Sequence, residues 1–413
     1  MRTRLRARWL GVAVALVWGL PIAPTSVAGD LVVRGDVVHT VSGEPLEPGV
    51  VLIRGARIVA VGRPEAVAVP AGTPELRARV VTPGLIDAHS VVGVSGMLNQ
   101  SHDQEQLEKS APIQPELRAV DAFNADDELV AYVRSLGVTT LHTGHAPGAL
   151  ISGQTMVVKT HPSRLDESVL VPMAMIATTL GDGSLSGKPD KAPGTRAKAV
   201  ALLRAELVKA GEYARKRETG EVDKRPAWDL RLEALAKVLD RSVPLLVTVH
   251  RHQDVLAALR LAEEFRLRLV LDGVSDAPMV LDDVRKSGFP VLLHPSMWRP
   301  FQEARNLSLE TASKLQAAGI PFALQSGFES YVPKTRIVLF EAAVAAANGL
   351  SFGDALASVT LGAARILGVS DRVGSLEPGK DADLALYDGD PFEYTTHCVG
   401  VVVNGVVTDS VPR

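Results

Sequence analysis

Cysteine is almost absent from this chain. Cys398 is the single cysteine among 413 residues, so no intramolecular disulfide can form. Small exported proteins often need disulfides because their cores are too small to be stable alone. A chain of this length can bury a large apolar core without them, and it has room for two or three domains or for one barrel with an appendage. The shortage of cysteine therefore does not argue against export.

The chain also has no block of basic residues and no nucleotide-binding motif. Its formal net charge is -3, which offers little to neutralise a run of phosphates. Neither a GxGxxG nor a GxxxxGKS pattern follows any strand-like segment. Apolar residues make up 46% and charged residues 22% of the chain, which is ordinary for a globular protein. Nucleic-acid and nucleotide binding therefore have no support.

Only the N-terminus carries an apolar segment of the kind that targets a chain to a membrane. Arginines at positions 2, 4, 6 and 8 precede an apolar stretch from 9 to 20, and the small residues Ser26 and Ala28 follow. This pattern predicts a signal peptide over 1–28 and a mature chain that begins near Gly29. An uncleaved anchor is the alternative, although the run is short for a full span. We expect an exported protein, periplasmic or secreted if the source is bacterial, with no membrane span after cleavage.

The two ends of the chain are similar in pattern. Short alternating strands with tight turns fill 30–79, and similar text follows from 384, with Asn404 and Gly405 as a hairpin turn. We therefore expect a discontinuous β-sandwich domain assembled from 29–82 and 378–413.

The middle of the chain alternates apolar strand-like runs with amphipathic helical stretches. This order favours a parallel sheet, and roughly 290 residues are enough for a distorted TIM (β/α)8 barrel over 83–377. A doubly wound open sheet is the alternative. In a barrel the functional residues stand where strands end. The residues at these predicted ends are His89, His142, His145, His250, His252, Gly273, His294 and Gly327.

Three segments carry a family resemblance. The run at 80–93 is VVTPGLIDAHSVVG, the run at 137–159 is GVTTLHTGHAPGALISGQTMVVK, and the C-terminal run at 355–392 contains GSLEPGKDADL. Together they resemble the amidohydrolase superfamily, and in particular its imidazolonepropionase-like members. The resemblance covers essentially the whole chain after the signal peptide. It implies a metal-dependent hydrolase of C–N bonds, in cyclic amides or other non-peptide or peptide-like substrates, with one or two zinc or other divalent ions at the barrel mouth.

The resemblance also implies a ligand set, of which this chain retains two members. His89 matches the first histidine of the His-x-His pair, and His250 matches the histidine of the fifth strand. Four other expected positions carry no suitable side chain: Val91, Ile176, Gly273, and Gly327 at the place of the aspartate that acts as general base. A catalytic zinc needs three protein ligands, and loss of a general base alone costs about 10²- to 10⁴-fold in rate. No catalytic residue and no cofactor can be assigned with this set.

Further side chains could modify this picture. His142, His145 or His294 could join His89 and His250 in a rewired mononuclear zinc site. Alternatively, His142 and His145 are solvated loop residues, and His294 fills volume that the lost ligands vacate. Pocket-lining roles are conceivable for His252, Glu116 and Arg118. For the last two, the sequence favours a surface loop that precedes a helix start.

Three functions remain open on the sequence. The first is a catalytically impaired or inactive homologue that binds a small-molecule or peptide-like ligand. The second is an active hydrolase with a rewired zinc site rich in histidine. The third is a structural protein or a partner subunit, in a homo-oligomer or in a hetero-oligomer with an active amidohydrolase.

Overall fold

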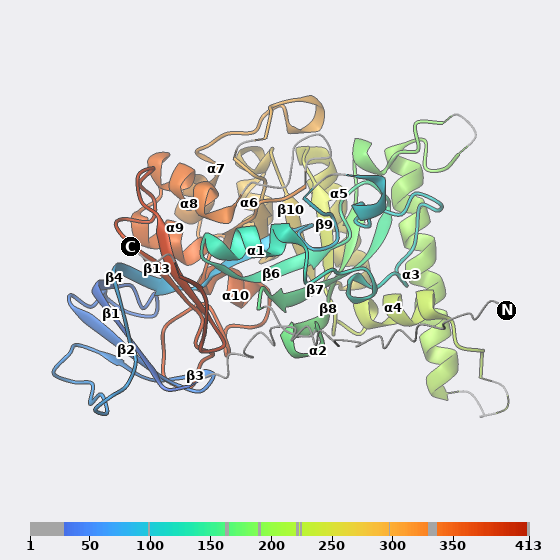
Figure 1. The fold of residues 1–413 in the computed structure, drawn as a ribbon. Coiled ribbons are helices and arrows are strands. Elements are labelled where there is room, and N and C mark those ends of the chain that lie inside the picture. The colour runs from blue at the N-terminus through green and yellow to red at the C-terminus, as the bar shows by residue number, and fades with distance from the viewer. Residues whose placement is uncertain are drawn as a thin grey trace, which may run out of the picture.

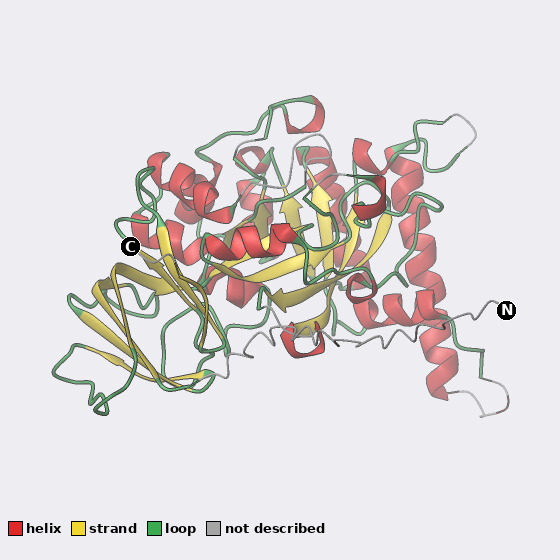
Figure 2. Cartoon of the chain, viewed as in Figure 1, coloured by secondary structure: helices red, strands yellow, loops and turns green. Residues whose placement is uncertain are grey.

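The computed structural model describes residues 29–97, 100–161, 165–188, 191–219, 223, 225–296, 298–328 and 337–410. The predicted signal peptide, 1–28, lies outside these residues. The described strands form two sheets, one of seven strands and one of eight, with helices packed around the larger sheet (Figure 2). No helix in the described part of the chain combines the length and the apolar character that a membrane span requires.

The smaller sheet is built from both ends of the chain, as predicted. Its strands run in the order β15-β14-β13-β4-β1-β2-β3. Figure 1 shows the blue N-terminal strands beside the red C-terminal ones. The bounds are β1 (Leu31–Val38), β2 (Gly49–Arg54), β3 (Arg57–Gly62), β4 (Glu75–Pro83), β13 (Leu384–Tyr387), β14 (Cys398–Val403) and β15 (Val406–Ser410). Strands β4 and β13 join the two ends in antiparallel pairing. Asn404 and Gly405, both at positive φ, make the predicted hairpin turn.

The larger sheet is a nearly closed barrel. Its strands are β5 (Leu85–Ser90), β6 (Val138–Gly144), β7 (Ile151–Lys159), β8 (Val169–Thr179), β9 (Leu245–Val249), β10 (Leu269–Gly273), β11 (Val291–Leu293) and β12 (Phe322–Leu324). They follow one another around the sheet in chain order. A parallel bridge between Ser90 and Gly327 connects the first strand to the last, and the Gly327 N–H donates to the His89 carbonyl at 3.0 Å.

One barrel strand runs against the others. Strand β7 pairs antiparallel with both β6 and β8, whereas the other neighbouring pairs are parallel. Only residues 145–150 separate β6 from β7, which is too short for a crossover helix. The predicted distortion of the barrel is therefore an antiparallel strand inserted among seven parallel ones.

Helices pack outside the barrel, and the last of them also packs against one end of the barrel interior. They are α1 (Glu128–Ser135), α2 (Leu165–Ser168), α3 (Arg196–Thr219), α4 (Leu230–Leu239), α5 (His252–Phe265), α6 (Leu281–Ser287), α7 (Thr311–Ala317), α8 (Val338–Ala347), α9 (Phe352–Ser358) and α10 (Leu361–Ile366). The barrel interior is a separate apolar cluster to which each strand except β6 contributes, including Ile86, Ala88 and Met175. Ala363 and Ala364 of α10 belong to the same cluster. This part of the barrel is therefore a filled apolar core, and a group of polar side chains lies toward the opposite end of the strands.

A buried lysine ties the two sheets together. Lys159, at the end of β7, is almost fully buried. Its Nζ lies 2.7 Å from Asp381 and 2.9 Å from Asp383, and it donates to Asn404 as well. Arg372 also binds Asp381, at 2.9 Å. The two aspartates of the C-terminal PGKDADL motif therefore form a contact between the two sheets.

Candidate active site at the barrel mouth

The polar end of the barrel follows directly from strand alternation. Side chains two residues apart on a strand face the same side. Leu246, Val270 and Ala323 lie in the barrel core, so the next inward positions are Thr248, Asp272 and Gln325. On β5 the pairing register shifts between Asp87 and Ser90, and His89 joins the same group. A small chamber at the mouth is lined by His89, Pro147, Thr248, His250, Asp272, Pro295, Trp298, Gln325, Gly327 and Phe328.

Asp272 is the centre of this chamber. Its Oδ1 accepts hydrogen bonds from His89 Nδ1 at 3.1 Å and from Gln325 Nε2 at 2.7 Å, and its Oδ2 accepts one from Thr248 Oγ1 at 2.5 Å. The side chains of His89 and Asp272 are both almost fully buried. Because a carboxylate only accepts, Nδ1 of His89 carries a proton and Nε2 faces away from Asp272.

The electrostatics of this pair favour its charged form. Burial raises the pKa of Asp272, but the adjacent His89 and the three hydrogen bonds outweigh burial and lower the pKa to about 2. Burial lowers the pKa of His89, and the Asp272 carboxylate reverses the effect and holds the pKa above its ordinary value. Sequence reasoning missed Asp272, because the resemblance directed attention to a histidine expected one residue later. Its strand-end position was the available signal.

The place of the missing sixth-strand histidine is filled by the ring of His250. Gly273 has a φ of +85°, which only glycine adopts readily. A Cβ at this position would lie 2.7 Å from Cε1 of His250 and 3.2 Å from each of its ring nitrogens. His250 itself is fixed by a hydrogen bond between Nδ1 and Ser275 Oγ at 2.9 Å, and burial lowers its pKa.

The place of the missing general base is filled in the same way. Gly327 has a φ of +67°, and a Cβ there would lie 2.5 Å from Cγ and 3.1 Å from Cδ of Pro295. Carbon atoms normally pack at about 3.5 to 4.0 Å. Neither glycine is therefore an empty slot that a ligand side chain could simply reoccupy.

The two remaining substituted positions are apolar core. Val91 and Ile176 are fully buried in the cluster that packs the barrel against its helices. Since Met175 lies in the barrel interior, Ile176 faces outward and the next inward position on β8 is Ala177. The residue that faces the site on the fourth strand is therefore Ala177, which offers no ligand atom.

Of the other candidate histidines, His142 lies beside His89, with ring centroids 5.5 Å apart. His142 uses both ring nitrogens, because Nδ1 donates to the Ala88 carbonyl at 2.6 Å and Nε2 pairs with Thr155 Oγ1 at 2.7 Å. Burial lowers the pKa of His142 to about 3. His145 is also buried, and it lies against Gly153 outside the chamber lining. Neither is the solvated loop residue that the sequence allowed, because β6 extends to Gly144 and carries them into the fold.

His294 follows β11 at the mouth. Its Nδ1 donates to the Pro295 carbonyl at 3.2 Å, and burial lowers its pKa to about 4. Its Nε2 is buried without a hydrogen-bond partner in the described part of the molecule. His294 is not among the residues that line the chamber.

The three residues expected at the pocket edge lie elsewhere. His252 begins α5 and pairs with Asp276 at 3.1 Å. Glu116 is 3.6 Å from Arg231, and Arg118 is 3.7 Å from Asp121. None of them lines the chamber or the larger cavity outside it.

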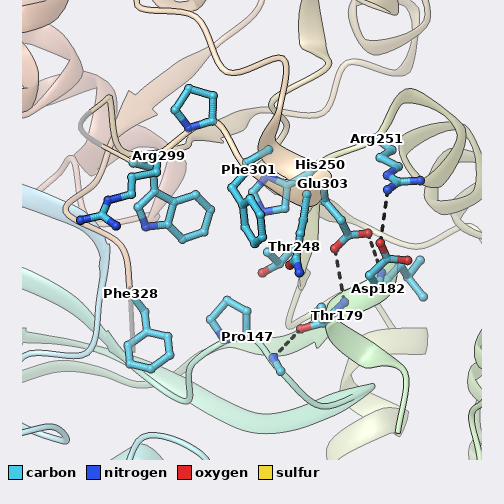
Figure 3. Close-up of a pocket in the computed structure, with 17 residues that line it drawn as sticks. Pro147, Thr179, Asp182, Thr248, His250, Arg251, Arg299, Phe301, Glu303 and Phe328 are labelled. Carbon is cyan, nitrogen blue, oxygen red and sulfur yellow. Dashed lines mark hydrogen bonds and ion pairs between the residues drawn. The ribbon is translucent and has the colours of Figure 1, made fainter. Parts of the chain in front are cut away.

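A cavity of about 1170 Å³ opens outside the chamber. The two share Pro147, Thr248, His250, Trp298 and Phe328. Figure 3 shows Phe328 and Pro147 on one side of the cavity, Phe301 and His250 across from them, and the Asp182–Arg251 ion pair toward one end. Aromatic side chains and prolines therefore line part of the cavity, together with polar and charged residues.

The residues present do not fit the family's metal centre. Among the residues that the structure describes, no three His, Cys, Asp or Glu side chains are grouped so that they could hold one metal ion. Both nitrogens of His142 are already used, whereas His89 and His250 each use only Nδ1 in a hydrogen bond. Nε2 of His89 and of His250 could still bind a metal, but two nitrogens are fewer than the three protein ligands that a catalytic zinc needs. The arrangement can hold a buried charge pair and hydrogen-bond a ligand, but it does not present a ligand set for zinc.

Comparison with known proteins agrees with this architecture. A model of the "Amidohydrolase family" matches residues 299–409. The imidazolonepropionase of Mesorhizobium japonicum is 25% identical over 83% of this chain and 87% of its own length. The amidohydrolase tasK of Hapsidospora irregularis is 25% identical over 79% of this chain, which spans only 36% of that relative. A crystal structure of an amidohydrolase from Thermotoga maritima superposes with a TM-score of 0.87 at 26% identity, covering 92% of this chain and 100% of that one.

The chain belongs to the amidohydrolase superfamily. Its long matches to imidazolonepropionases place it among the imidazolonepropionase-like members. Both findings agree with the predicted family and barrel, and they support a C–N bond hydrolase as its general class.

Proposed function

We propose that this chain is a ligand-binding amidohydrolase homologue in which metal-dependent hydrolysis is lost or strongly impaired. The observation that carries the proposal is the packing at Gly273 and Gly327. Both glycines have left-handed backbone, and His250 and Pro295 fill the space that a ligand side chain would need.

The remaining groups cannot supply the missing chemistry in the usual way. Zinc-dependent hydrolysis needs a metal that lowers the pKa of a bound water and a carboxylate that accepts the proton. Asp272 is the one carboxylate among the described residues that line the chamber, and it already accepts hydrogen bonds from three side chains. It is therefore better suited to hold His89 in place than to take a proton from water.

What the site retains is a place for a ligand. The chamber and the cavity outside it are continuous through shared lining residues, and the cavity is large enough for a small molecule or a short peptide-like ligand. The chain has therefore lost the groups for metal-dependent hydrolysis, but it keeps a cavity that can bind a ligand. A rewired hydrolase and a partner subunit are the competing functions.

Metal analysis tests the proposal without relying on activity. Protein purified with added zinc and then passed over a desalting column is expected to carry well under one zinc per chain. The matched variants His89→Ala, His250→Ala and His252→Ala should give the same low content. Stoichiometric zinc that is lost in the first two variants and kept in the third would overturn the proposal and establish a rewired site.

We also propose that residues 1–28 direct export. The arginine-rich start and the apolar run after it support this. Sequencing the N-terminus of the mature protein should give a start near Gly29. An intact Met1 on protein recovered from the producing cell would refute cleavage.

A further inference from the structure

One wall of the large cavity is a single segment of the chain. Every residue from 298 to 304 lines the cavity (Figure 3), and the segment follows strand β11. Both of its flanks are anchored. Ser296 Oγ donates to the buried carboxylate of Glu341 at 2.6 Å, and Asn306 donates to Asp276 at 2.8 Å. The segment therefore spans the cavity between two fixed points.

Between these anchors the backbone of the segment is held by local contacts. The Trp298 N–H donates to the Pro295 carbonyl at 3.3 Å, and the Ala304 N–H donates to the Phe301 carbonyl at 3.0 Å. Gln302 has a φ of +49°, which is unfavourable for a residue with a side chain and persists only where the surrounding structure holds it. Release of the segment would therefore relieve strain at Gln302.

Glu303 fastens the segment to the loop that follows β8. Its carboxylate accepts hydrogen bonds from the backbone N–H groups of Asp182 and Gly183, and from Arg196 at 3.1 Å. Arg196 also binds Asp182 at 2.7 Å and Asp254 at 2.9 Å, so this guanidinium joins three elements at the barrel mouth. The contacts of Glu303 all end on one side chain, so they form and break together.

The position that receives Glu303 requires a glycine. Gly181 has a φ of +107°, and a Cβ there would lie 2.5 Å from Oε1 of Glu303 and 3.0 Å from Oδ2 of Asp254. Because glycine has no Cβ, the carboxylate of Glu303 can lie directly against the backbone of the neighbouring loop. A side chain at 181 would push Glu303 out of this position.

We propose that residues 298–304 form a flap over the cavity, that Glu303 fastens the flap shut, and that the flap opens while the barrel stays folded. Proteins open locally where few contacts hold a segment, and Glu303 supplies several of the contacts here. The inference goes beyond the proposed function, since it concerns how the cavity opens and not what it binds.

Hydrogen exchange of the Trp298 indole N–H measures this opening. Nε1 of Trp298 is buried, so its proton exchanges with solvent when the flap is open. Replacement of Trp9, Trp18 and Trp228 by phenylalanine leaves Trp298 as the only tryptophan of the full chain, with one indole signal in an NMR spectrum. The exchange rate then follows the fraction of molecules in which the flap is open.

Glu303→Ala in this background should speed the indole exchange by at least about tenfold, because it removes several hydrogen bonds at once. Gly181→Ala should act in the same direction by displacing the carboxylate. Its matched control is Gly187→Ala, at a left-handed glycine where a Cβ would meet nothing within 4 Å. Glu264→Ala, which breaks the exposed Arg204–Glu264 pair outside the cavity, should change the exchange by less than about twofold.

The backbone amides of β9 separate local opening from global unfolding. Faster indole exchange in Glu303→Ala, with unchanged exchange in β9, supports the flap. Unchanged indole exchange, or the same acceleration in β9, would overturn it. The measurement involves neither zinc nor a ligand. Its failure therefore leaves the proposed function standing, and a failure of the proposed function in the metal analysis leaves the flap standing.

Discussion

Substitution of Gly327 by alanine tests whether the general-base position is truly closed. Gly319 provides a matched control, because both glycines have a φ of +67° and a Cβ at Gly319 would meet nothing within 4 Å. Left-handed backbone costs a non-glycine residue about 1 to 2 kcal/mol, and the reduced freedom of the unfolded chain returns about 0.4 to 1 kcal/mol. Gly319→Ala should therefore lower the free energy of unfolding by about 1 kcal/mol.

Gly327→Ala should cost more, because its Cβ would lie 2.5 Å from Cγ of Pro295. The rigid proline ring cannot rotate away, and overpacking of this kind costs about 1 to 3 kcal/mol in addition. Urea unfolding of the wild type and both variants, followed by circular dichroism, measures the difference. Equal losses in the two variants would refute the claim that Pro295 fills the site. In that case an aspartate at 327 could fit, and Gly327→Asp would be worth testing for zinc uptake.

Three further predictions concern buried polar groups. Asp272→Asn leaves His89 buried without its carboxylate and should cost about 3 kcal/mol in urea unfolding; adding His89→Gln should cost less than the sum of the single changes, and additivity would contradict the pairing. His294 has its pKa lowered by burial to about 4, so below pH 6.5 the unfolded chain binds a proton that the folded chain refuses. Stability therefore falls as the pH is lowered, and His294→Gln should reduce that slope by about 1 kcal/mol per pH unit between pH 6 and 4.5. An unchanged slope would refute the shift. Lys159→Met leaves the buried Asp383 without a cation, although Asp381 keeps Arg372, and it should cost about 3 to 5 kcal/mol. The loss should be seen as a much lower Tm, and a Tm near that of the wild type would show that the lysine is not required.

The sequence was a good guide to the fold because its signals are local. The alternating strands at both ends, the Asn404–Gly405 turn and the PGKDADL motif each require a specific short-range conformation. The antiparallel strand β7 was not predicted, because the pattern of apolar residues in a strand does not depend on the strand's direction in the sheet. The short link at 145–150 is the one signal that a helix crossover was impossible.

The candidate site was predicted only in part. His89 and His250 lie in one chamber because both stand at strand ends that the barrel brings together. Asp272 was missed because the resemblance directed attention to the next residue, Gly273, and because its contact with His89 joins two strands that are far apart in the chain. The filling of Gly273 and Gly327 by His250 and Pro295 was equally invisible, since it depends on packing between segments far apart in the chain.

The pairing of β4 with β13 sets an order for folding during synthesis. Pro83 pairs with Leu384, roughly 300 residues later in the chain. At about 5 to 20 residues per second, strand β4 waits roughly 15 to 60 s for its partner to leave the ribosome. Until then one edge of β4 has no neighbour, and an unpaired edge readily recruits other chains. A chain that stops before β13 should therefore aggregate rather than persist as a shortened barrel, which makes translation past residue 384 a condition for a soluble product.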